Sequence, residues 1–280
     1  MSDRGRAAAL ARELAHRYPL PTLGRRLIEV RLDDTPEVAV AEILADLGAH
    51  DSTLDWFCER TDTLRDQGVT SAEAIRRIGV PEVHAAALVA AIADIGGEPG
   101  TERVDWLDFW RLAVGTGVAA RMALPPMSPH LLDAFTLGLC HDLGLLLLDR
   151  SNPSMLDPLL HDTDWKHRTP TEEREHLGFA LHELTAHLLH QWGFPLAMVL
   201  ALLEFEQPRR SSLGEVLRIG QSCARALCSA EEGLSADPSS DAILLALARF
   251  LRQYRALVDG ALVGLLAPEG PVRAVPKSLR

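Results

Sequence analysis

The apolar run from Leu137 to Leu148 contains one residue pair that could do chemistry, His141–Asp142. Burying two titratable groups in such a run is costly unless each has a partner. Neighbouring side chains diverge on a helix, but both could meet one metal ion if Asp142 reached back, and the ion would activate water for phosphoester cleavage. The alternative is that His141 and Asp142 form hydrogen bonds with neighbouring helices and bind no metal.

A second group of histidines lies between residues 176 and 190. His182 and His187 resemble the HExxH zinc motif, but they stand five residues apart, about 140° around a helix, and this spacing excludes that motif. On one helix from Glu173 to Trp192, leucines form an apolar stripe, and His176, His187 and His190 point away from it. His182 lies at the margin of the stripe and is the histidine best placed to reach a site at the core edge.

The composition argues against several other functions. Lys and Arg total 28 against 39 Asp and Glu, and this net charge of −11 is unlike that of a nucleic-acid binder. The chain has no Gly-rich phosphate loop, no G-x-S-x-G serine and no CxxC pair. The N-terminus is unlike a signal peptide, and the apolar run 134–148 is short for a membrane span. We therefore expect a cytoplasmic protein with no membrane or nucleic-acid partner and no cofactor.

The elements that must position these residues are helices. Ala and Leu dominate, β-branched and aromatic residues are sparse, and alternating runs are hard to find, so the sequence predicts an all-α fold. Capping boxes at Thr70 and Thr169 predict helix starts, and glycines at 79 and 193 predict helix ends.

Two long helices are predicted to carry the candidate residues, one from about His130 to Leu148 and one over Glu173–Trp192. The clearest boundary is the Gly- and Pro-rich stretch 96–100. The predicted division is an N-terminal helical bundle 1–97, a second helical part 101–230, a C-terminal helix extension 237–267 and a loose tail 268–280.

Five groups of motifs follow one another along the chain in a specific order. They are Tyr18–Pro21, Ile43–Leu54 with its segment Ala49–Leu54, Ser71–Gly79, Phe109–Trp110 with Gly138–Gly144, and Gly178–Glu183 with Leu188–Pro195. In order and spacing they resemble the HDOD family, the HD-related output domain of bacterial signalling proteins, over about residues 18–230. The resemblance implies two packed helical parts, with 101–230 related to HD-type metal phosphohydrolases. It also implies a non-catalytic regulatory module, because family members commonly lack part of the superfamily's metal set.

The resemblance further implies where the superfamily's metal ligands fall. The His-Asp pair is kept as His141 and Asp142, and a later histidine as His182. The first histidine falls among Arg111, Leu112 and Ala113, a later histidine pair is replaced by Glu204-Phe205-Glu206, and the last aspartate by Gln221 or Ser222. With two or three ligands missing, no bound metal is expected, although Glu204 or Glu206 could supply an oxygen. The implied vestigial site comprises His141, Asp142, His182, Glu204, Glu206 and Gln221, of which His141, Asp142 and His182 are the remaining candidate metal ligands.

Three functions remain open at this point. The favoured one is a signalling or regulatory protein without catalytic activity, which binds a partner protein, or a small nucleotide, through its helical surfaces. The second is a divergent metal-dependent phosphohydrolase that uses His141, Asp142 and His182 with Glu204 or Glu206. The third is an assembly role as a homodimer joined through the C-terminal helix.

Overall fold

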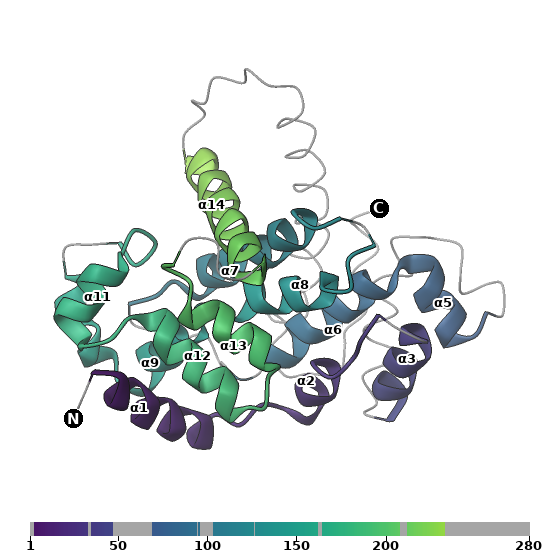
Figure 1. Cartoon of the computed structure of the whole chain (residues 1–280), viewed down its shortest axis with the longest axis horizontal. Helices are drawn as coiled ribbons and strands as arrows, with labels where there is room; N and C mark the ends of the chain where they lie inside the picture. Colours follow the sequence, from purple (N-terminus) through teal and green to yellow (C-terminus); the bar gives the residue numbers. More distant parts are fainter. Residues whose placement is uncertain are drawn as a thin grey trace, which may run out of the picture.

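The structure is a computed structural model that describes residues 3–32, 35–46, 69–93, 95, 103–125, 127–161, 164–207 and 212–232. These residues form helices joined by turns, and no strand occurs among them (Figure 1). The predicted all-α fold is therefore confirmed. The predicted C-terminal extension, the boundary at 96–100 and the motif at Ala49–Leu54 lie outside the described residues, and the predicted division into parts stays a prediction.

The helices follow the chain in two groups. The first group is α1 (Asp3–Arg17), α2 (Thr22–Leu27), α3 (Pro36–Asp46), α5 (Ser71–Ile78) and α6 (Val80–Ala93). The second group is α7 (Trp106–Met122), α8 (Leu131–Cys140), α9 (Leu143–Ser151), the 3-10 turn η3 (Pro153–Met155), α10 (Asp157–Leu160), α11 (Pro170–Leu177), α12 (Leu181–Gln191), α13 (Leu196–Leu203) and α14 (Ser212–Glu232).

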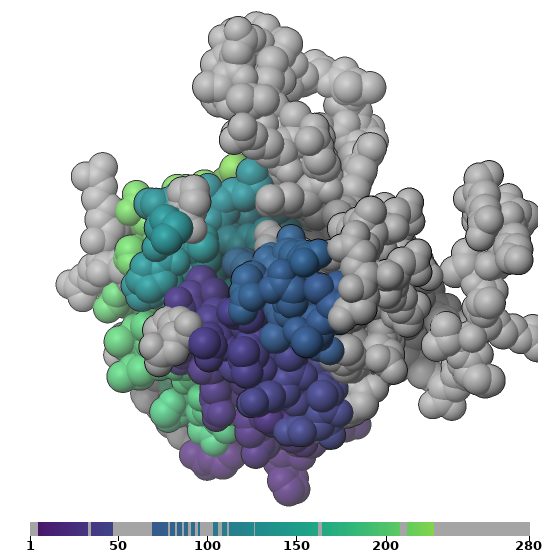
Figure 2. Space-filling view, turned by 90° about the vertical axis from the view of Figure 1, so that its right-hand side faces the viewer, coloured from purple at the N-terminus to yellow at the C-terminus, as the bar shows by residue number. Residues whose placement is uncertain are grey.

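The N-terminal helices pack against both groups. Helix α1 lies along α12, while α2 contacts α3 and α6, and α6 contacts α8. Figure 2 shows the purple N-terminal segments on one face of the molecule, between the blue helices α5 and α6 and the green surface of later helices. Trp192, at the end of α12, donates from its indole Nε1 to the carbonyl oxygen of Tyr18 at 3.1 Å. Residues 3–20 are thus fixed directly to the part of the chain that carries the candidate site.

The centre of the fold is formed by α7, α8 and α14, whose backbones approach closely at glycines. A Cβ added to Gly138 of α8 would lie 2.5 Å from the Cα of Gly117 in α7. A Cβ added to Gly220 of α14 would lie 2.5 Å from the carbonyl oxygen of Thr116. Because no side chain fits at either position, glycine is required for these helices to pack at this distance.

The local helix signals are confirmed where the structure describes them. The Thr70 side chain accepts a hydrogen bond from the N–H of Glu73 at 3.3 Å and starts α5. Thr169 and Glu172 form a reciprocal capping box at the start of α11. Gly79 and Gly193 follow helix ends with φ angles of 116° and 81°, in the left-handed region where a Cβ is unfavourable.

The prediction of two continuous long helices around the candidate residues is wrong, because each is divided into two helices. The predicted helix His130–Leu148 is interrupted at His141 and Asp142, which separate α8 from α9. The predicted helix Glu173–Trp192 is interrupted after Leu177, because Gly178 adopts a left-handed conformation (φ 81°) and ends α11. Apolar periodicity continues across both breaks, so the sequence pattern did not reveal them.

The segment Leu131–Ser151 is long and apolar enough to cross a membrane by length and composition. Within the structure, however, 89% of its most apolar window is buried, and it includes the break between α8 and α9. Its leucines belong to the core, where Leu137, Leu139 and Leu145 are fully covered. The segment therefore has the burial of a core element.

Candidate functional site

His141 and Asp142 form the turn between α8 and α9. Asp142 has φ −116° and ψ 11°, outside the helical region, and its carbonyl accepts the N–H of Leu145 at 2.9 Å. Both side chains are buried, with 4% and 5% of their surface exposed. The turn therefore places two titratable side chains inside the core.

One ring nitrogen of His141 is bonded within its own helix. Its Nδ1 lies 2.6 Å from the carbonyl oxygen of Gly138, which can only accept, so Nδ1 carries the proton. Among the described residues Nε2 has no hydrogen-bond partner, and it lies 3.8 Å from Oδ2 of Asp142. Burial lowers the pKa of His141, and this effect outweighs the charge of Asp142, which acts to raise the pKa. We therefore assign a neutral ring whose Nε2 is an acceptor.

Asp142 is held by an arginine that the sequence did not suggest. Its Oδ1 accepts a hydrogen bond from Nη2 of Arg168 at 2.5 Å, and both side chains are almost fully buried. Burial alone would raise the pKa of Asp142, but the charge of Arg168 and its hydrogen bond outweigh burial and lower the pKa from 3.8 to about 2. Asp142 is therefore a carboxylate at neutral pH.

Arg168 extends this contact into a buried network. Its Nη1 donates to the carbonyl oxygen of Trp165 at 2.5 Å, and its Nε lies 2.9 Å from Oε1 of Glu173. The other oxygen of Glu173 accepts the N–H of Leu181 at 2.7 Å, at the start of α12. The network thus joins the α8–α9 turn, the segment before α11, α11 itself and α12.

A second cluster lies at the start of α12 and the end of α13. Ligand atoms of His182, Glu183 and Glu206 lie within 4.8 Å of one another, and Nε2 of His182 is 3.5 Å from Oε2 of Glu206. Arg174 contacts both carboxylates, with Nη2 at 2.9 Å from Glu183 and Nη1 at 3.0 Å from Glu206. The hydrogen bond from Arg174 lowers the pKa of Glu206, and burial lowers the pKa of His182.

The implied site residues therefore separate into two groups and two outliers. His141 and Asp142 share the turn, while His182 and Glu206 share the second cluster with Glu183. Glu204 ends α13, and Gln221 is a partly exposed residue of α14; neither belongs to the network or the cluster. The burial of His182 agrees with the sequence prediction, as does the exposure of His176 and His190. His187, which was predicted to point away from the stripe with them, is instead partly buried, and burial lowers its pKa.

Sequence reasoning missed Arg168, Glu173 and Arg174. Arg168 directly precedes a capping box and lies 26 residues from Asp142, so no helical spacing connects them. Glu173 and Arg174 look like ordinary helix acids and bases. What distinguishes these residues is that their charged side chains pack against the candidate site residues. That contact can be recognised only in the three-dimensional structure.

The resemblance noted in the sequence implies a relation to HD-type phosphohydrolases and hence a metal centre, and the residues present can be tested against that implication. Oδ2 of Asp142 and Nε2 of His141 are buried atoms without hydrogen-bond partners in the described part of the chain, but a metal site needs more ligands than two. The other Asp142 oxygen is bound to a guanidinium. Where the first histidine is expected, Leu112 and Ala113 are buried apolar residues. These residues do not fit a two-metal centre.

Comparisons with known proteins agree with this architecture. A phosphohydrolase, so described provisionally, from Shewanella amazonensis SB2B superposes with a TM-score of 0.65 at 18% identity, over 92% of this chain and 98% of that protein. A provisionally described signal transduction protein from Marinobacter aquaeolei VT8 gives a TM-score of 0.64 at 18% identity, over 92% and 66%. An HDOD domain protein of unknown function from Geobacter sulfurreducens gives 0.62 at 16% identity, over 90% and 89%.

At these identities the solved structures show a shared fold. A search of curated proteins finds no match to the chain. The sequence model of the HDOD domain family, in contrast, matches residues 64–208, more than half of the chain. The resemblance seen in the motifs is thereby confirmed, and the chain belongs to the HDOD domain family.

Proposed function

We propose that this protein is a cytoplasmic signalling or regulatory protein that acts by binding a protein partner and catalyses no reaction at its HD-type site. The observation that supports this most directly is the 2.5 Å contact between Asp142 and Arg168. In a metal hydrolase the aspartate of the pair would be a metal ligand. Here its carboxylate is neutralised by a guanidinium that is itself fixed by Glu173 and the Trp165 carbonyl.

The second cluster supports the same proposal. Arg174 binds both carboxylates that could join His182 in holding an ion. A guanidinium and a divalent cation compete for the same oxygen lone pairs, so ion pairing and metal coordination oppose each other there. Both remnants of the site therefore carry an arginine where a hydrolase would carry metal charge.

A metal-dependent phosphohydrolase is the alternative. It is favoured by Nε2 of His141 and Oδ2 of Asp142, which lie 3.8 Å apart and form no hydrogen bond with any residue that the structure describes. The Shewanella structural neighbour also carries a phosphohydrolase description, although a fold at 18% identity does not transfer an activity.

Metal content and hydrolysis separate the two functions. The purified full chain is analysed for Mn, Fe and Zn by mass spectrometry and assayed on cyclic dinucleotides and bis(p-nitrophenyl) phosphate with each metal added. We expect substoichiometric metal and no turnover. Stoichiometric metal that disappears in His141→Ala but remains in His190→Ala, an exposed histidine on α12, would overturn the proposal.

A further inference from the structure

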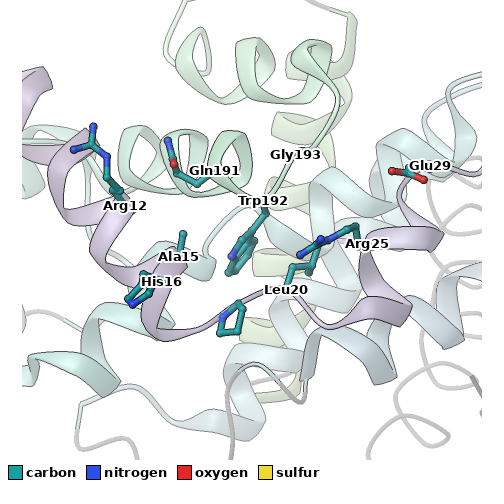
Figure 3. A pocket seen from close by; sticks show the side chains of 10 residues that line it. Arg12, Ala15, His16, Leu20, Arg25, Glu29, Gln191, Trp192 and Gly193 are labelled. Carbon is teal, nitrogen blue, oxygen red and sulfur yellow. The ribbon is translucent and has the colours of Figure 1, made fainter.

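An open groove lies where α1, α2 and the end of α12 meet. Its volume is about 550 Å³, and Arg12, His16 and Arg25 line it together with Leu20 and Trp192. Figure 3 shows Trp192 and Leu20 at the centre with Arg25 beside them, and Arg12 and Glu29 at opposite ends. The groove therefore combines an apolar floor with cationic side chains on both sides.

The arginines of this groove are available for a ligand. Within the described residues, neither Arg12 nor Arg25 has a recorded hydrogen bond or ion pair, and both side chains are exposed. Their neighbourhood is basic, because residues 3–32 contain seven arginines and three acids, in a chain whose net charge is −11. Arg26 is paired with Asp46, but the exposed Arg12 and Arg25 keep the groove attractive to an anionic partner.

An apolar stripe begins on α13, three positions after Gly193, which is the last residue of the groove in sequence. Leu196, Leu200 and Leu203 occupy one face of α13 at positions i, i+4 and i+7, with 63%, 43% and 37% of their surface exposed. Single exposed leucines are ordinary, but three on one helix face form the kind of surface that receives an amphipathic helix. The stripe and the groove together favour a partner that is both acidic and apolar.

We propose that the groove and the α13 stripe form a docking surface for an acidic amphipathic helix of a partner protein. This inference rests on the proposed partner-binding function and adds the place and the chemistry. The chain's own amphipathic C-terminal segment does not suit the groove, because it carries arginines of the same sign, at positions 249, 252 and 255. The phosphates of a nucleic acid could bind the arginines, but a nucleic acid would not need the exposed leucines as contacts.

The test measures fluorescence anisotropy of a labelled helical peptide with leucines at i, i+4 and i+7 and glutamates elsewhere. A peptide with lysine at every glutamate position is the charge control. We expect the glutamate peptide to bind the full chain and to weaken as ionic strength rises. Binding should fall by about tenfold or more in Arg12→Glu/Arg25→Glu and in Leu200→Asp. Arg17→Glu, an exposed change on α1 outside the groove, should bind as the wild type does.

Several results would overturn the docking surface. They are absence of glutamate-peptide binding, equal binding by all variants, or arginine-dependent binding of duplex DNA or pyrophosphate in place of the peptide. Light scattering that shows a dimer lost in Leu200→Asp would assign the stripe to a second copy. None of these variants alters the HD-type site, so failure here leaves the metal and hydrolysis assays to decide the non-catalytic proposal separately.

Discussion

Replacing Arg168 with alanine should destabilise this protein more than removing any surface arginine. The side chain is 3% exposed and contacts the carboxylates of Asp142 and Glu173 at 2.5 and 2.9 Å. Its removal leaves two carboxylates in the core without their ion-pair partner, with the charge of the partly buried Arg225 acting on them from nearby. Breaking a buried pair in this way costs about 3–5 kcal/mol, a large fraction of the roughly 5–15 kcal/mol that keeps a protein folded.

Urea unfolding followed by far-ultraviolet circular dichroism measures this loss directly. Arg174→Ala is the matched control, since it also removes an arginine from two carboxylates, but its side chain is 40% exposed and solvent screens the pairs. We expect it to cost less than about 1 kcal/mol. Removing all three charges of the buried network together, in Asp142→Asn/Arg168→Met/Glu173→Gln, should recover part of the stability lost in Arg168→Ala.

Equal losses in Arg168→Ala and Arg174→Ala would refute the argument, because burial would then add nothing to the pair. A triple variant that is less stable than Arg168→Ala would also contradict it. That result would mean that the turn is stabilised by the geometry of the hydrogen bonds. Compensation of the Asp142 and Glu173 charges by Arg168 would then not be the source of the stability.

Three further predictions follow from other features of the structure. Gly138→Ala should cost about 1–3 kcal/mol in urea unfolding, because the added methyl lies 2.5 Å from the Cα of Gly117; an unchanged stability would show that α7 and α8 can separate. Thr169→Ala should cost about 1 kcal/mol and Thr169→Ser little, because only the hydroxyl accepts from Glu172; equal losses would contradict the capping role. Asp142, whose pKa falls from 3.8 to about 2 on folding, contributes stability that is complete above its unfolded pKa and lost as the pH falls towards its folded pKa. Unfolding measured from about pH 5 to pH 2 should therefore lose about 2 kcal/mol that Asp142→Asn does not lose, although Glu173, whose pKa burial raises, offsets part of this.

The helix signals that the sequence predicted correctly are local. Thr70 and Thr169 bond to amides three residues away, and Gly79 and Gly193 adopt backbone angles that favour glycine. Such interactions depend on neighbours in the chain, so the sequence contains all that is needed to recognise them. The all-α fold follows from the same kind of information, summed over the whole chain.

The two helix breaks were missed for the opposite reason. Leucines flank His141 and Asp142 on both sides, and a helical pattern continues unchanged through the turn. The turn is stabilised by contacts distant in sequence: Arg168 binds Asp142, and the N–H of Gly144 donates to the Thr185 hydroxyl at 3.1 Å. The periodicity of a single sequence does not show which distant residues will come into contact. The candidate residues were therefore identified from the sequence, but the residues around them were not.

The surroundings decide what the His-Asp pair can do. A carboxylate in the core needs a positive charge beside it, and either a metal ion or a guanidinium can supply that charge. The metal would leave open positions for water and substrate, whereas Arg168 directs its donors to Asp142 and the Trp165 carbonyl and places its Nε beside Glu173. Arg168 therefore supplies, at the α8–α9 turn, the positive charge that a metal ion would otherwise supply. Through Arg168 and Glu173, Asp142 is connected to three further segments of the core, and this structural role is compatible with the non-catalytic function proposed above.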